Sequence, residues 1–89
     1  MDISIIIVNF NTAKMTGECI ASIYKHIHGI DFEIILVDNN STDNSVAYLK
    51  EKFPDMELIS LKENIGFGRA NNCGAKKAKG KYLFLLNSD

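Results

Sequence analysis

The chain has 89 residues, enough for one domain with a thin hydrophobic core. Its 46% of hydrophobic and 24% of charged residues are typical of a globular protein and argue against a disordered, collagen-like or coiled-coil chain. The net charge of −1 gives no global attraction to nucleic acid, and the longest apolar runs are too short to span a bilayer. We identify no export signal, so Cys19 and Cys73 are expected to be free, buried thiols of a cytoplasmic protein.

Strand and helix patterns alternate along the first half of the chain. A β-branched apolar run at residues 3–8 predicts a strand that is covered on both faces. Apolar residues at three- and four-residue spacing then predict an amphipathic helix that ends near His28. Residues 32–37 predict a second buried strand, and Ser41 or Thr42 is expected to cap the helix that follows it.

The second half continues the alternation. Residues 57–61 predict a third strand, a glycine-containing loop follows, and residues 69–78 predict a third helix. The inner face of this helix is expected to consist of small residues: Ala70, Cys73, Gly74 and Ala78. Residues 82–86 predict a fourth strand. The order β-α-β-α-β-α-β indicates a three-layer α/β/α fold with a mostly parallel sheet.

Polar or glycine-containing loops follow all four predicted strands, at residues 9–12, 38–43, 62–69 and 87–89. Because ligands of parallel sheets bind beyond the carboxyl ends of the strands, we expect these loops to form one site. Asp38 directly follows an apolar strand, where a carboxylate can accept a hydrogen bond from a ribose hydroxyl or a base N–H. The same loop also has residues typical of a plain helix-capping turn.

The loop after the third predicted strand contains Gly66 and Gly68, which would let the backbone approach a phosphate closely. Asn71 stands where the dinucleotide-binding fingerprint has its third glycine, so the fingerprint is not matched and a plain turn remains the alternative. Arg69 adds a planar, permanently charged donor that suits phosphate.

The last predicted strand is followed by Asn87-Ser88-Asp89. A carboxylate two residues beyond an amide can help to hold Mg²⁺ or Mn²⁺ against a pyrophosphate, although a plain turn also explains three such residues. Residues 62–81 contain six basic residues and one acidic residue, which indicates either a local anion-attracting patch or a solvated face.

Several segments jointly resemble the family 2 inverting glycosyltransferases, and within them the rhamnosyltransferase-like branch. They are SIIIVNFN at residues 4–11, VDNNSTD at 37–43, ENIGFG at 63–68, NN at 71–72 and LNSD at 86–89. The resemblance covers the whole chain in the right order. It implies a GT-A fold, in which a Rossmann-like, nucleotide-binding half precedes an acceptor-binding half.

The resemblance also implies which residues hold a UDP- or dTDP-linked sugar donor. Those expected to line or wrap the nucleotide are Val8, Asn9, Asn11, Asp38, Asn64, Gly66, Phe67, Gly68 and Arg69. Asp38 would contact the base or the ribose, Asn87 the donor nucleoside or sugar, and Asp89 a divalent Mg²⁺ or Mn²⁺ ion. Asn87 departs from the family's D-x-D motif, of which an N-P-D form is common in the rhamnosyltransferase-like branch.

No residue matches the family's catalytic base, which lies further along the chain in that family. Inverting transfer needs a carboxylate to deprotonate the acceptor hydroxyl. We therefore interpret residues 1–89 as the donor-binding, N-terminal part of a longer transferase, and we expect the isolated chain to be inactive. The resemblance implies a role of the parent in polysaccharide biosynthesis, with a saccharide or lipid-linked acceptor at the inner face of the membrane.

Two other classes are weighed against this interpretation. A non-catalytic nucleotide-binding or interaction module would use the same scaffold without sugar transfer. A receiver-like or flavin-binding domain is disfavoured, because a receiver needs an aspartate at the end of its third strand, where this chain has Leu61 and Lys62. In the GT-A strand order 3-2-1-4 the apolar fourth strand lies at an edge of the sheet, which predicts a homodimer through that edge.

Overall fold

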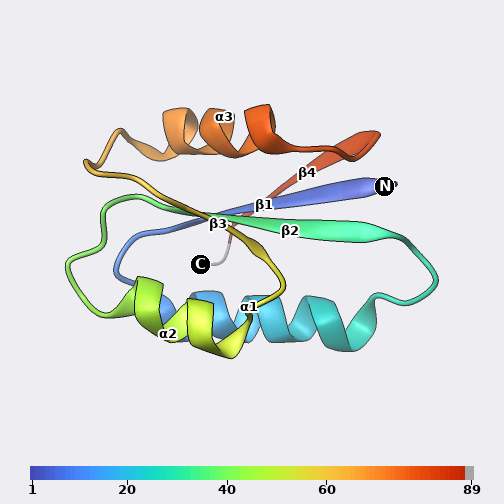
Figure 1. Cartoon of the computed structure of the whole chain (residues 1–89), viewed down its shortest axis with the longest axis horizontal. Coiled ribbons are helices and arrows are strands. Elements are labelled where there is room, and N and C mark those ends of the chain that lie inside the picture. The colour runs from blue at the N-terminus through green and yellow to red at the C-terminus, as the bar shows by residue number, and fades with distance from the viewer. Residues whose placement is uncertain (88–89) are drawn as a thin grey trace.

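The structure, a computed structural model, describes residues 1–87, so Asp89 lies outside the described part. Its elements are β1 (Ile3–Asn9), α1 (Ala13–His26), β2 (Phe32–Asp38), α2 (Ser45–Lys52), β3 (Glu57–Ser60), α3 (Phe67–Lys77) and β4 (Tyr82–Leu86). The predicted alternation of strands and helices is confirmed. Figure 1 shows the sheet between α3 on one side and α1 with α2 on the other, as expected for three α/β/α layers.

The four strands form one parallel sheet in the order β3-β2-β1-β4, which confirms the predicted order 3-2-1-4. The central strands β1 and β2 are in register along their whole length, so that Asn9 and Asp38 lie opposite each other at the carboxyl ends. The crossovers through helices place the following loops at the same edge. The first three polar loops predicted to form one site are therefore brought together there, with Asn87 from the described part of the fourth.

Side chains alternate between the two faces of the sheet and form two hydrophobic clusters. One cluster joins Ile5, Ile7 and Leu36 to apolar residues of α1 and α2. The other joins Ile6 and Val37 to α3, through residues that include Ala70. Because both faces of β1 and β2 are covered, these strands are mostly apolar, with Ser4 and Glu33 as exceptions ahead of their polar last residues.

The inner face of α3 differs from the prediction at Asn71, Cys73 and Ala78, the last of which already follows the helix. Its buried residues are Ala70, Asn71 and Gly74, whereas Cys73 and Ala78 are only half-buried. Both cysteines are free thiols, as expected, but neither is fully buried. Partial burial raises the pKa of the Cys19 thiol by desolvation. The prediction of buried thiols was therefore wrong.

Two helices begin or end away from their predicted positions. Helix α1 ends at His26, before the predicted end near His28, because Ile27 already has an extended backbone. Helix α2 has Asn44 at its N-cap, so the prediction that Ser41 or Thr42 caps it was wrong. The N–H of Ser45 instead donates to Asp43 Oδ1 at 2.9 Å. Hydrogen bonds from Ser45 lower the pKa of Asp43.

Strand β4 lies at an edge of the sheet and is paired only with β1 among the described strands. Its first four side chains are largely exposed, from 52% for Leu83 to 72% for Tyr82, whereas Leu86 packs against the core. Tyr82 and Phe84 lie in register with Ile3 and Ile5, and Leu83 alternates with them onto the opposite face. Within residues 1–87, no helix combines the length and the apolar character needed to cross a membrane.

Candidate functional site

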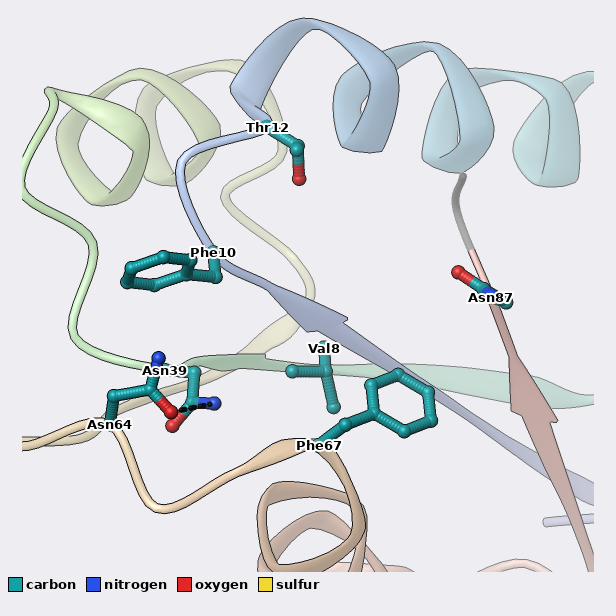
Figure 2. A pocket seen from close by; sticks show the side chains of 7 residues that line it. All are labelled: Val8, Phe10, Thr12, Asn39, Asn64, Phe67 and Asn87. Carbon is teal, nitrogen blue, oxygen red and sulfur yellow. Dashed lines mark hydrogen bonds between the residues drawn. The ribbon is translucent and has the colours of Figure 1, made fainter.

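A cavity of about 300 Å³ lies at the carboxyl ends of the strands. It is lined by Val8, Phe10, Thr12, Asn39, Asn64, Phe67 and Asn87. Figure 2 shows Val8 between the rings of Phe10 and Phe67, with Asn39 and Asn64 side by side. The cavity thus has an apolar centre, two aromatic side chains and a set of neutral amide and hydroxyl groups.

The cavity contains only part of the predicted residue set. Of the predicted nucleotide-binding residues, those that line it are Val8, Asn64, Phe67 and Asn87. Sequence reasoning missed Phe10, Thr12 and Asn39, which also line it. Phe10 could have been identified from the sequence, because it is an aromatic residue in an otherwise polar loop. Its side chain is 43% exposed. No comparable signal distinguished Asn39 from its neighbours in a loop that also fitted a plain turn.

Asn9 and Asp38 form a buried hydrogen-bond network at the ends of β1 and β2. Asn9 is fully buried and Asp38 is 2% exposed. The Asn9 amide donates to Asp38 Oδ1 at 2.8 Å, and Asn9 Oδ1 accepts from the Thr16 hydroxyl at 2.7 Å. Asp38 Oδ1 accepts from the Ser41 hydroxyl at 2.7 Å, and its Oδ2 accepts from the Ser41 N–H at 2.9 Å. Both carboxylate oxygens are therefore engaged within the chain, and a contact of Asp38 with base or ribose stays a prediction.

Asn11 connects two loops and does not line the cavity. Its backbone has a φ of 53°, a conformation that asparagine tolerates better than most residues. Asn11 Oδ1 accepts from the Thr42 N–H at 2.8 Å, and the Asn11 N–H donates to the Ser41 hydroxyl at 2.9 Å. These bonds tie the loop after β1 to the loop after β2.

The loop between β3 and α3 is fixed by two asparagines. The Asn39 amide donates to Asn64 Oδ1 at 3.0 Å, and Asn39 Oδ1 accepts from the Ile65 N–H at 3.0 Å. Asn64 Oδ1 also accepts from the Gly66 N–H at 2.9 Å. Gly66, at the N-cap of α3, has a φ of 86°, which favours glycine.

The helix after this loop begins at Phe67, earlier than predicted. Gly68 and Arg69 therefore belong to its first turn, and both are exposed. A Cβ at Gly68 would meet no atom within 4 Å, so this position is open. Neither residue lines the cavity, and their contacts with a pyrophosphate stay predictions.

Residues 1–87 contain no group of three or more histidine, cysteine or acidic side chains that could hold a metal ion. The predicted metal ligand, Asp89, lies outside the described residues. The oxygen-bearing side chains that line the cavity, Thr12, Asn39, Asn64 and Asn87, are all neutral.

A parallel α/β sheet with a cavity at the carboxyl ends of its strands is typical of the class of α/β domains that bind ligands at that edge. Residues 4–89 match the family described as "Glycosyl transferase family 2". The chain belongs to this family, and its structural neighbours show that its fold is GT-A. The resemblance found in the sequence is thereby confirmed at the level of the family.

Three known proteins illustrate the similarity. The glucosyltransferase WfaP of Escherichia coli, "UDP-Glc:alpha-D-GlcNAc-diphosphoundecaprenol beta-1,3-glucosyltransferase", is 38% identical over 98% of this chain and 35% of its own length. TarS 1-349 of S. aureus in complex with UDP-GlcNAc has a TM-score of 0.88 and 29% identity, over 100% of this chain and 27% of that chain. A mannosyltransferase from Pyrobaculum calidifontis in complex with GDP-Man and Mn²⁺ has a TM-score of 0.84 and 26% identity, over 98% and 27%.

The chain corresponds to a small part of its relatives. It spans between 10% and 35% of the length of the similar curated proteins. The activity of a whole protein that contains this domain is therefore proposed below and is not taken from the relatives.

Proposed function

We propose that the chain is the donor-binding part of an inverting, rhamnosyltransferase-like glycosyltransferase that transfers a sugar from a UDP- or dTDP-linked donor to an acceptor hydroxyl. The observation that carries this proposal is the cavity at the strand ends, with the exposed rings of Phe10 and Phe67 beside the amides of Asn39 and Asn64. The UDP-GlcNAc bound by TarS, a protein of the same fold, supports a nucleotide-sugar as the ligand.

The chemistry of the cavity matches the parts of such a donor. An aromatic ring can stack on a pyrimidine base, and the NH₂ group of the exposed Asn64 amide can donate to a C=O group of uracil or thymine. The pyrophosphate would lie near the first turn of α3, where backbone N–H groups and Arg69 attract anions. Asn9, Asn11 and Asp38 would support the site through their hydrogen bonds, in addition to the contacts that the resemblance implies.

We also propose that Asp89 holds a divalent Mg²⁺ or Mn²⁺ ion, which would neutralise charge on the pyrophosphate when bound. The Mn²⁺ ion in the mannosyltransferase complex supports this proposal. The acceptor would be a saccharide or a lipid-linked saccharide at the inner face of the membrane, in polysaccharide biosynthesis. The lipid-diphosphate acceptor in the name of the E. coli relative supports this acceptor class.

The test is a calorimetric titration of the chain with UDP and dTDP, with and without Mn²⁺. We expect weak binding, with a dissociation constant of about 1 mM or below, that Mn²⁺ strengthens. Phe67→Ala should weaken it by about 1 kcal/mol, because one stacking surface is lost. Tyr48→Ala removes an exposed ring of α2 as a matched control and should leave the affinity unchanged. If folded chain released no heat with any pyrimidine diphosphate, the proposal would fail.

We further propose that the chain forms a homodimer through the edge of β4. Unpaired N–H and C=O groups beside exposed apolar side chains favour pairing with another strand, and a two-fold axis closes the assembly. Sedimentation equilibrium at tens of micromolar should show twice the 9.9 kDa mass of the chain, and Leu83→Lys should return it to a monomer. A single 9.9 kDa species for the unsubstituted chain would contradict the dimer.

A further inference from the structure

The side chain of Asn39 connects the end of β2 to the loop that contains Asn64. It directly follows β2, and its backbone N–H donates to the carbonyl oxygen of Asn9 at 2.8 Å. Only 3% of Asn39 is exposed. The position of its amide is therefore fixed by the pairing of the two central strands rather than by the loop.

Both ends of this amide bind the loop. Its nitrogen donates to Asn64 Oδ1, and its oxygen accepts from the Ile65 N–H, each at 3.0 Å. Figure 2 shows the two asparagines joined in this way beside Phe10, with the chain continuing from Asn64 to Phe67 at the other side of Val8. The backbone that leads to Phe67 is thus held at residues 64–66.

The hydrogen bonds allow only one orientation of each amide. Asn39 Oδ1 faces a backbone N–H, and Asn64 Oδ1 faces both the Asn39 amide and the Gly66 N–H. Turning either amide around would place an NH₂ group against a backbone N–H. The buried Asn39 and the exposed Asn64 therefore have a defined arrangement.

We propose that Asn39 is a positioning residue that sets the conformation of the loop and thereby the place of Phe67 at the cavity. The importance of this for donor binding rests on the proposed function, but the positioning itself does not. In the free chain the loop is already held in the arrangement that lines the cavity, so that binding need not pay for ordering it.

The first test uses the chain without nucleotide and measures amide hydrogen exchange by NMR. In Asn39→Ala, the amides of Ile65 and Gly66 should exchange roughly tenfold faster, because the loop loses both hydrogen bonds to the Asn39 side chain. Asn44→Ala, at an exposed asparagine without a side-chain cap bond, is the matched control and should leave both rates unchanged. Unchanged exchange of Ile65 in Asn39→Ala would overturn the proposal.

The conservative variant Asn39→Asp gives a sharper pattern. Its carboxylate still accepts from the Ile65 N–H, but it can no longer donate to Asn64 Oδ1, so Asn64 must turn its own NH₂ towards the carboxylate. The Gly66 N–H then loses its acceptor. Ile65 should keep its protection while Gly66 exchanges faster. Equal loss or equal retention of protection at the Ile65 and Gly66 N–H groups would contradict the proposed arrangement. This variant remains informative if Asn39→Ala does not fold.

The second test measures UDP affinity. Asn39→Ala should bind UDP roughly tenfold more weakly than the unsubstituted chain, while Asn44→Ala binds equally well. Equal affinity of Asn39→Ala would overturn the link between positioning and binding. If the unsubstituted chain does not bind UDP at all, the proposed function fails, and the exchange pattern still decides whether Asn39 positions the loop.

Discussion

Gly74→Ala is expected to destabilise the chain, although alanine is the better helix former. A Cβ at Gly74 would lie 2.6 Å from Ile6 Cγ2 and 3.1 Å from Val37 Cγ2. Both side chains are fully buried in the sheet and have little room to move. Overpacking of this kind costs about 1–3 kcal/mol, and the helix preference of alanine offsets up to about 1 kcal/mol of it. We therefore expect a net loss of about 1–2 kcal/mol in the free energy of unfolding, measured by urea denaturation.

The same substitution at Gly68 is the matched control, because this residue lies in the same helix with open space around it. Gly68→Ala should leave stability unchanged or raise it by up to about 1 kcal/mol. In a background of Ile6→Ala, which removes the nearest methyl group, Gly74→Ala should cost less than in the unsubstituted chain. Equal changes in the free energy of unfolding for Gly68→Ala and Gly74→Ala would show that the close contact of α3 with the sheet does not determine the cost of the substitution.

The strands could be predicted because their signal is local and repeated. Uninterrupted apolar runs in β1 and β2 follow from burial on both faces, and β4 was predicted with its observed bounds. Helix boundaries were less certain because they depend on hydrogen bonds between distant residues. Helix α3 begins at Phe67, after a loop held by Asn39 from 25 residues earlier, and this bond has no signal in the local sequence.

The candidate site was predicted only in part, for a reason of geometry. Successive residues of a strand point to opposite faces, so neighbours in a motif have different surroundings. Val8 lies on the α3 side with the cavity, whereas Asn9 contacts Thr16 of α1. In the same way Asp38 points into the network with Ser41, and the adjacent Asn39 lines the cavity. The motif indicated the strand ends but did not show which of their residues lines the cavity.

Asp38→Asn is expected to lower stability strongly, although the two side chains have almost the same shape. The carboxylate accepts hydrogen bonds from the Asn9 amide, the Ser41 hydroxyl and the Ser41 N–H. An amide at this position places its NH₂ group against one of these donors. Because Asp38 is 2% exposed, water cannot satisfy the group that is left over. An unsatisfied buried polar group costs about 1–3 kcal/mol, and we expect a loss in this range by urea denaturation, against no change for the exposed Asp55→Asn.

Combining Asp38→Asn with Asn9→Asp should recover part of the loss, because the direction of the hydrogen bond between the two positions is then reversed. A carboxylate at position 9 can accept from the Thr12 and Thr16 hydroxyls, as Asn9 Oδ1 does, and from the new amide at position 38. That amide can accept from the Ser41 N–H through its oxygen. If the double variant is no more stable than Asp38→Asn alone, the hydrogen bond between positions 9 and 38 does not account for the loss of stability. If it restores stability but not UDP binding, Asp38 or Asn9 also contacts the nucleotide, as the family resemblance implies. If it restores both, the two residues support the site only through their hydrogen bonds.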